Sequence, residues 1–159
     1  MPIPRTPMVD DDGSGTTGTV INAAWKTELY DQIDTVGNWV KINWAANLFT
    51  PAGWVVDAGD LYTLQYSVVG RAATILMVFV GTSITTPGVG ALFTALPAAI
   101  TPVVDAVSQI RILNGGNWQI GTCVMQPGIA RMNIFKLDSA AFVLDTNATH
   151  ISGQITYAI

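Results

Sequence analysis

The residues with the most obvious capacity for chemistry form an acidic run, Asp10, Asp11 and Asp12, which is followed by Gly-Ser-Gly. Carboxylates placed before a glycine are typical of a calcium-binding loop. A loop that begins at Asp10 needs a bidentate glutamate at its twelfth position, and that position is Ile21. We therefore expect no metal site here, and we interpret the three aspartates as part of an acidic segment that attaches the protein to a partner.

The other candidate groups for catalysis are isolated from one another along the chain. Asp57 and Asp60 flank Gly59 in a pattern typical of a turn, where aspartate bonds to nearby backbone. The chain has one histidine, His150, and one cysteine, Cys123. Acid–base or nucleophilic catalysis needs two groups within hydrogen-bond reach, and a zinc site needs several ligands. The sequence therefore predicts no catalytic residue, no metal, no cofactor and no enzyme, with His150 at a surface or interface and Cys123 buried.

Five tryptophans remain as candidates for binding, because an aromatic face packs against the apolar face of a sugar. Trp25 and Trp44 lie on apolar stripes, so their position favours core packing. The other three lie near turns, and we interpret them as candidate glycan contacts: Trp39, Trp54 and Trp118.

Composition narrows the classes of partner. The 159 residues are enough for one domain with a substantial core. Hydrophobic residues make up 50% of the chain and charged residues only 11%, against about 25% in typical soluble domains. We expect other subunits to cover part of this apolar surface. The net charge of −4 argues against nucleic-acid binding, which normally uses a basic surface.

Membrane insertion does not explain the apolar excess. The longest mostly apolar run, Ala72 to Val80, is far shorter than the roughly 20 residues of a spanning helix, and it predicts a buried strand. The opening MPIPRTPMVDDD is too acidic and too rich in proline for an export signal.

The chain divides into three predicted parts. Residues 1–19 are rich in proline, glycine, threonine and aspartate, which predicts a flexible attachment arm. Residues 20–37 carry Ile21, Trp25, Leu29 and Ile33 at helical spacing, which predicts a short helix that ends at Gly37. Because so short a helix depends on packing, we expect its stripe to lie against the body or against other copies, as an oligomerisation element. Residues 38–159 form the body.

The body shows the alternation of β-strands. Its last segment places Ile151, Ile155, Tyr157 and Ile159 on one face and polar residues on the other. The strand predicted over Ala72 to Val80 is apolar on both faces, which favours a central strand or a subunit interface. Turns are predicted at Gly70-Arg71, Asn114-Gly115 and Pro127-Gly128. About eight strands punctuated by glycine and proline predict a mainly β fold, a jelly-roll-like β-sandwich preceded by the arm and one short α-helix.

Three segments carry a resemblance to a known group. The segments YTLQYSVVGRAATILMVFVG and LFTALPAAITP resemble the C-terminal domains of bacteriophage tail fibres and related virion appendages. In that group a tyrosine-containing strand, a glycine turn, an apolar strand and a strand ending in Leu-Pro follow in order. The front, DDDGSGTTGTVINAAWKTELYDQID, is similar to the N-terminal segment of uncharacterised phage structural proteins.

This resemblance implies a non-enzymatic structural protein of the virion, either a short fibre or a decoration protein of head or tail. It implies a homotrimer that is fixed to other virion proteins by its N-terminal part and presents its distal face to the host surface. The alternative from the residues themselves is a carbohydrate-binding jelly-roll module. Buried tryptophans favour the structural protein, whereas an exposed pair beside polar loops favours sugar binding.

Overall fold

The computed structural model describes residues 29–31, 33, 36–45, 53–88, 91–93, 96–129 and 131–159. The chain divides into two compact units, Met1–Asn38 and Trp39–Ile159. In the first unit, residues 29–31 and 33 are helical, and Gly37 follows with a φ of 77° that suits the end of a helix. The predictions that involve Asp10, Asp11, Asp12, Ile21 and Trp25 lie outside the described residues. Among those residues, no helix has both the length and the apolar character needed to cross a bilayer.

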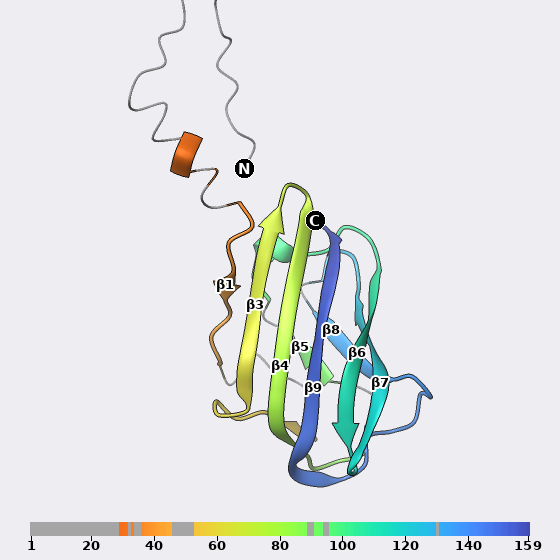
Figure 1. Cartoon of the computed structure of the whole chain (residues 1–159). Coiled ribbons are helices and arrows are strands. Elements are labelled where there is room, and N and C mark those ends of the chain that lie inside the picture. The colour runs from red at the N-terminus through yellow and green to blue at the C-terminus, as the bar shows by residue number, and fades with distance from the viewer. Residues whose placement is uncertain are drawn as a thin grey trace, which may run out of the picture. The chain divides into compact units, whose positions relative to one another are not determined.

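The second unit is built from one antiparallel sheet (Figure 1). Its strands follow the order β1-β3-β4-β9-β6-β7-β8-β5, and β2 pairs with β4 beside this path. A short 3-10 helix, η1 (Ala98–Ile100), lies between β5 and β6. The strands are β1 (Val40–Lys41), β2 (Trp54–Val55), β3 (Leu61–Val69), β4 (Ala72–Ile84), β5 (Ala91–Phe93), β6 (Ala106–Asn114), β7 (Asn117–Met125), β8 (Met132–Lys136) and β9 (Asp145–Ala158).

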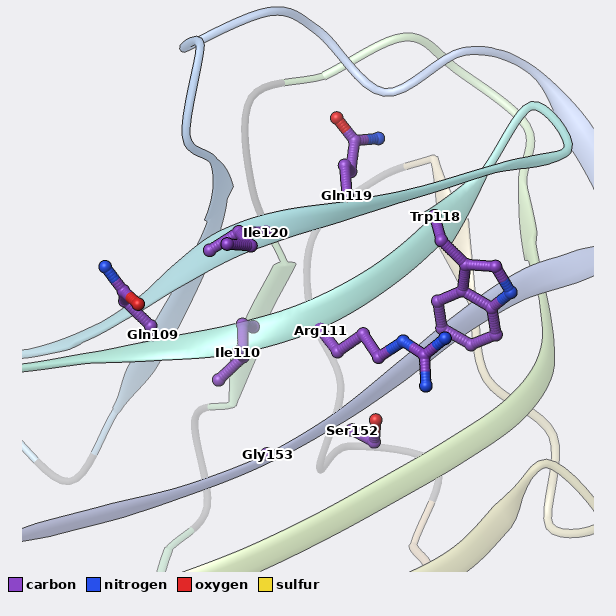
Figure 2. Close-up of a pocket in the computed structure, with 8 residues that line it drawn as sticks. All are labelled: Gln109, Ile110, Arg111, Trp118, Gln119, Ile120, Ser152 and Gly153. Carbon is purple, nitrogen blue, oxygen red and sulfur yellow. The ribbon is translucent and has the colours of Figure 1, made fainter.

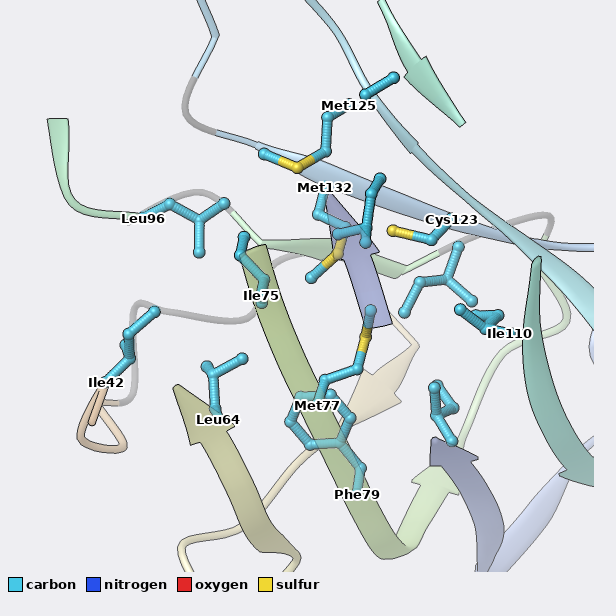
Figure 3. Packing of buried hydrophobic residues seen from close by; sticks show 14 of the residues in the cluster. Ile42, Leu64, Ile75, Met77, Phe79, Leu96, Ile110, Cys123, Met125 and Met132 are labelled. Carbon is cyan, nitrogen blue, oxygen red and sulfur yellow. The ribbon is translucent and has the colours of Figure 1, made fainter. Parts of the chain in front are cut away.

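The sheet curls so that its two ends face each other across the core. Figure 1 shows β5 and β8 behind the layer formed by β3, β4 and β9. Ile75 and Met77 of β4 belong to the same buried cluster as Met125 of β7 and Met132 of β8 (Figure 3). The predicted fold class is therefore confirmed as mainly β and sandwich-like, with the two layers formed by halves of one continuous sheet.

Alternation along the long strands separates this core from an outer face. On β4, Ala73, Ile75, Met77 and Phe79 are buried, and the residues between them are half-buried or exposed. On β9, the predicted inner face is confirmed, since Ile151, Ile155 and Tyr157 are buried. These strands are neighbours, so their outward side chains form one continuous surface.

Two glycines permit the close packing of the curl. A Cβ atom on Gly121 of β7 would meet the side chain of Ile112 and would lie 2.6 Å from the carbonyl oxygen of Phe135. A Cβ atom on Gly153 of β9 would meet Ile110 of β6. The inner surface of β6 therefore packs over strand positions that have no room for a side chain.

The turn between β6 and β7 differs from the prediction by one residue. Asn114 pairs with Asn117, so the two central residues are Gly115 and Gly116, with φ of 61° and 77°. Hairpin turns of this kind need positive φ at both central positions, and two glycines provide it without strain. Asn114 consequently belongs to β6, where its side chain is buried.

The segment that follows Asn38 joins the sheet only briefly. Only Val40 and Lys41 pair with β3, as β1. Ile42 is buried, but Trp44 is 38% exposed and donates from its indole nitrogen to the carbonyl oxygen of Val56. The prediction that Trp44 is a core residue is therefore wrong, because the chain leaves the sheet before reaching it.

Candidate functional site

The structure separates the three tryptophans that were candidate glycan contacts. Trp54 is 7% exposed, its ring lies 4.7 Å from that of Phe142, and its indole nitrogen donates to Thr82. This burial contradicts the prediction for Trp54, since β2 pairs with β4 and turns the ring into the core. Trp39 and Trp118 are 47% and 51% exposed. They remain available for a ligand.

Trp118 borders a shallow depression of about 440 Å³ on the outer face of β6, β7 and β9 (Figure 2). The strand register explains which side chains meet there. Arg111 of β6 stands opposite Ser152 on one side and Ile120 on the other, so the three side chains share the outer face. Gln109 lies two residues before Arg111, so it shares that face and extends the depression along β6.

Arg111 and Trp118 form the centre of this site. The guanidinium carbon of Arg111 lies 3.9 Å from the centroid of the Trp118 ring, which is close enough for a cation–π interaction. The imidazole of His150 lies at the edge of the same group, 6.2 Å from the Trp118 ring and tilted by 57°. Within the described part of the chain, no carboxylate forms an ion pair with Arg111. Its charge is therefore available to an external group.

A second group of polar side chains lies buried at the end of the sheet where β6 turns into β7. The amide nitrogen of Asn114 donates to Asp145 and to the hydroxyl of Thr149, both at 2.9 Å. The hydroxyl of Thr149 donates to Asp145, and Thr82 donates to the Thr149 carbonyl oxygen. Trp54 completes the network through Thr82. Every buried polar side-chain atom in the described residues has a partner, so this network fixes structure and offers no free group to a ligand.

The residues considered for catalysis do not come together. Asp57 and Asp60 close a turn, in which the backbone nitrogen of Asp57 donates to the Asp60 carboxylate at 2.9 Å. Cys123 is buried as predicted, and burial raises the pKa of its thiol far above the usual range. Tyr157 donates to the carbonyl oxygen of Ile100, and its pKa is raised by burial and, less strongly, by Cys123. The described residues contain no group of three potential metal ligands.

Sequence reasoning identified Trp118 but missed its neighbours. Arg111, Gln109 and Ser152 are ordinary polar residues of strands, and no local motif distinguishes them. Their grouping depends on the pairing of β6 with both β7 and β9. The outward alternation of Gln109 and Arg111 is the one signal in the sequence that could have indicated a shared face.

Comparison with known proteins gives one similarity in structure. No family model and no curated protein matches the chain. The chain is similar to the crystal structure of the head domain of phage bIL170, which was described in a study of a common fold for the receptor-binding domains of lactococcal phages. The match has a TM-score of 0.45 and 14% sequence identity, and it covers 77% of this chain and 98% of that one.

Proposed function

We propose that this protein is a non-enzymatic structural component of a bacteriophage virion, a short fibre or a decoration protein of head or tail. In this proposal it assembles as a homotrimer, is anchored through its N-terminal arm, and contacts the host surface with its body. The observation that carries the proposal is the apolar outer face of β4, on which Leu76 and Val78 are half-buried and Val80 is exposed.

β4 lies inside the sheet, between β3 and β9, and its inner side chains fill the core. Its outward residues include Thr74 at one end and then Leu76, Val78 and Val80, of which Val80 is 42% exposed. A strand whose outer face meets water normally carries polar residues there. Apolar residues on both faces favour burial of the outer face by another subunit, as does the low content of charged residues.

The end of the sheet near the C-terminus adds to this apolar surface. Val69 pairs with Ala72, and Ala72 pairs with Ala158, whose carbonyl oxygen accepts a hydrogen bond from Val103. Val69 and Val103 are 54% and 55% exposed, so exposed valines from two distant segments lie at the same end of the sheet. A homo-oligomer gives a natural cover for such surfaces, because the same patch recurs on every copy.

The segment that resembles phage tail fibres supports the same proposal. It corresponds to β3, the turn at Gly70 and β4, so the resemblance covers the hairpin that carries the apolar outer face. The proposal assigns attachment to Asp10, Asp11 and Asp12 and oligomerisation to the helix with Ile21, Trp25, Leu29 and Ile33.

Native mass spectrometry of the full chain tests the proposal. We expect a trimer for the wild type, and loss of the trimer without loss of the β-sheet signal for Val80→Lys. Leu137→Lys is the control, since Leu137 is an exposed apolar residue in the turn after β8. A monomeric wild type at micromolar concentration contradicts the proposal. Equal effects of the two substitutions show that β4 is not the interface.

The second candidate is a carbohydrate-binding module, which is favoured by the exposure of Trp39 and Trp118. A monomer that binds saccharides supports this alternative.

Replacing Trp25 and Leu29 together by alanine separates two roles of the helix. Packing between copies predicts loss of the oligomer with a folded body, whereas packing on the chain's own body predicts loss of the fold.

A further inference from the structure

We propose that Arg111, held over the ring of Trp118, binds the anionic group of a surface saccharide, a carboxylate or a phosphate. This inference rests on the proposed contact with a host surface, and it names the chemistry of that contact. In this inference Arg111 binds the anion, and Trp118 positions the Arg111 guanidinium.

The position of Arg111 over the Trp118 ring prepares it for an anion. A guanidinium held over an aromatic ring by a cation–π interaction has five N–H donors, and it can use them to bind a second group. These N–H groups form a fork that matches the two oxygens of a carboxylate or phosphate. Arg111 forms no ion pair within the described residues, and its guanidinium is held 3.9 Å from the Trp118 ring. The ring therefore orients a charge that no described carboxylate neutralises.

The charges around the depression favour an anionic ligand. Arg111 is the one charged residue among the eight described residues that line it. The whole net charge of −4 comes from residues 1–38, because the basic and acidic residues of residues 39–159 balance. Arg111 is therefore a local positive charge on a body with no net charge of its own. A neutral sugar would leave this guanidinium without an ion-pair partner, and a cation would be repelled by it.

The remaining outward side chains suit a saccharide. Gln109 and Ser152 present an amide and a hydroxyl, which bond to sugar hydroxyls in either direction. Ile120 is 51% exposed on the same face and gives an apolar surface for the C–H side of a pyranose. Figure 2 shows Arg111, Trp118 and Ser152 grouped at one end of the depression, with Gln109 at the other end. This spacing leaves room for a sugar residue next to the anion-binding group.

The test is a titration of the full chain at low ionic strength with two pairs of probes. The first pair is trigalacturonate and neutral galactotriose, and the second is glucose 1-phosphate and glucose. Calorimetry gives the dissociation constant, and NMR follows the indole N–H signal of Trp118. We expect the anionic member of at least one pair to bind at least tenfold more tightly than its neutral partner and to shift the Trp118 signal. A preference for trigalacturonate identifies a carboxylate, and a preference for glucose 1-phosphate identifies a phosphate.

Three variants locate the interaction. Arg111→Gln is expected to weaken binding of the preferred probe at least tenfold. Arg111→Lys keeps the charge but loses the planar fork, so its affinity should fall between those of Arg111→Gln and the wild type. Arg71→Gln is the control, because it removes the same charge from an exposed turn.

Several results would overturn the inference. These are an absence of binding by both anionic probes at millimolar concentration, equal binding of the neutral probes, or equal losses in Arg111→Gln and Arg71→Gln. Failure of the proposed function is distinguishable from failure of this inference. The first is seen as a monomeric wild type in native mass spectrometry, and the second is seen as anion binding that is absent or does not depend on Arg111.

Discussion

Replacement of Asn114 by alanine is expected to destabilise the body strongly, although the residue lies beside an exposed hairpin turn. Asn114 is 3% exposed, and its amide makes hydrogen bonds to three other residues. The amide nitrogen donates to the Val143 carbonyl oxygen at 3.0 Å, and the amide oxygen accepts from the Val143 nitrogen at 2.8 Å. One side chain therefore joins the end of β6 to the loop before β9 and to Asp145 and Thr149 within β9.

The expected loss follows from these bonds. Each neutral hydrogen bond contributes about 1 kcal/mol and a bond to a charged group about 1.5 to 3 kcal/mol. Asp145 and Thr149 still bond to each other in the variant, which limits the loss on that side. The two bonds to Val143 and the bond to Asp145 together give a decrease of about 3.5 to 5 kcal/mol in the free energy of unfolding. For a domain of this size we expect the melting temperature to fall by roughly 10 °C.

Urea unfolding followed by circular dichroism measures this difference, with Asn117→Ala as the matched control at equal protein concentration. Asn117 lies across the same turn, is exposed, and donates only to the carbonyl oxygen of Gly115 at 3.2 Å. Its replacement should cost less than about 0.5 kcal/mol. If the free energies of unfolding of the two variants differ by less than that amount, Asn114 does not hold the end of β6 to the loop before β9, and the reasoning is wrong.

Three further predictions concern the core and the arm. Gly121→Ala should destabilise the body by about 3 kcal/mol, because the new Cβ would meet the carbonyl oxygen of Phe135. Gly59→Ala is the control in the same urea experiment, and it should be nearly neutral because the space around Gly59 is open. Cys123 should not react with a thiol reagent at pH 8 until the protein is denatured. Because burial raises the pKa of this thiol in the folded protein, only the unfolded chain loses the thiol proton readily above about pH 8.5, and the free energy of unfolding should decrease as the pH rises past that value. Deletion of residues 1–18 should leave the calorimetric melting temperature of the body unchanged but prevent incorporation into phage particles; an unfolded truncated protein would contradict this assignment of the arm.

The parts of the fold that the sequence predicts well are those set by local alternation. The strands β4 and β9 are long, and their inner and outer residues follow a period of two over many positions. The turn at Gly70 could likewise be predicted because its chemistry is local. These features need no knowledge of which strand pairs with which.

The errors occur where distant segments decide the outcome. Trp54 lies in a strand of two residues, and its burial depends on Phe142 and Thr82, which are far away in the sequence. Asn114 precedes a glycine pair, so an Asn-Gly turn and a Gly-Gly turn compete locally, and the structure adopts the second. The Gly-Gly turn places Asn114 in β6. There its side chain bonds to the loop before β9 and to β9 itself. The site at Arg111 was missed for a related reason, because it exists only through pairing across three strands.

The outer face of the sheet divides into two regions of different chemistry. Its β4 side carries Leu76, Val78 and Val80, and its β6–β7 side carries Arg111 and Trp118. Between them runs β9, whose outward residues are polar, so the two regions are separated by two strand spacings, or about 10 Å. Such a separation lets one region be covered by another subunit while the other stays open to a ligand. Substitutions at Val80 and Arg111 should therefore act independently, the first on assembly and the second on binding, since sites this far apart without shared partners rarely couple.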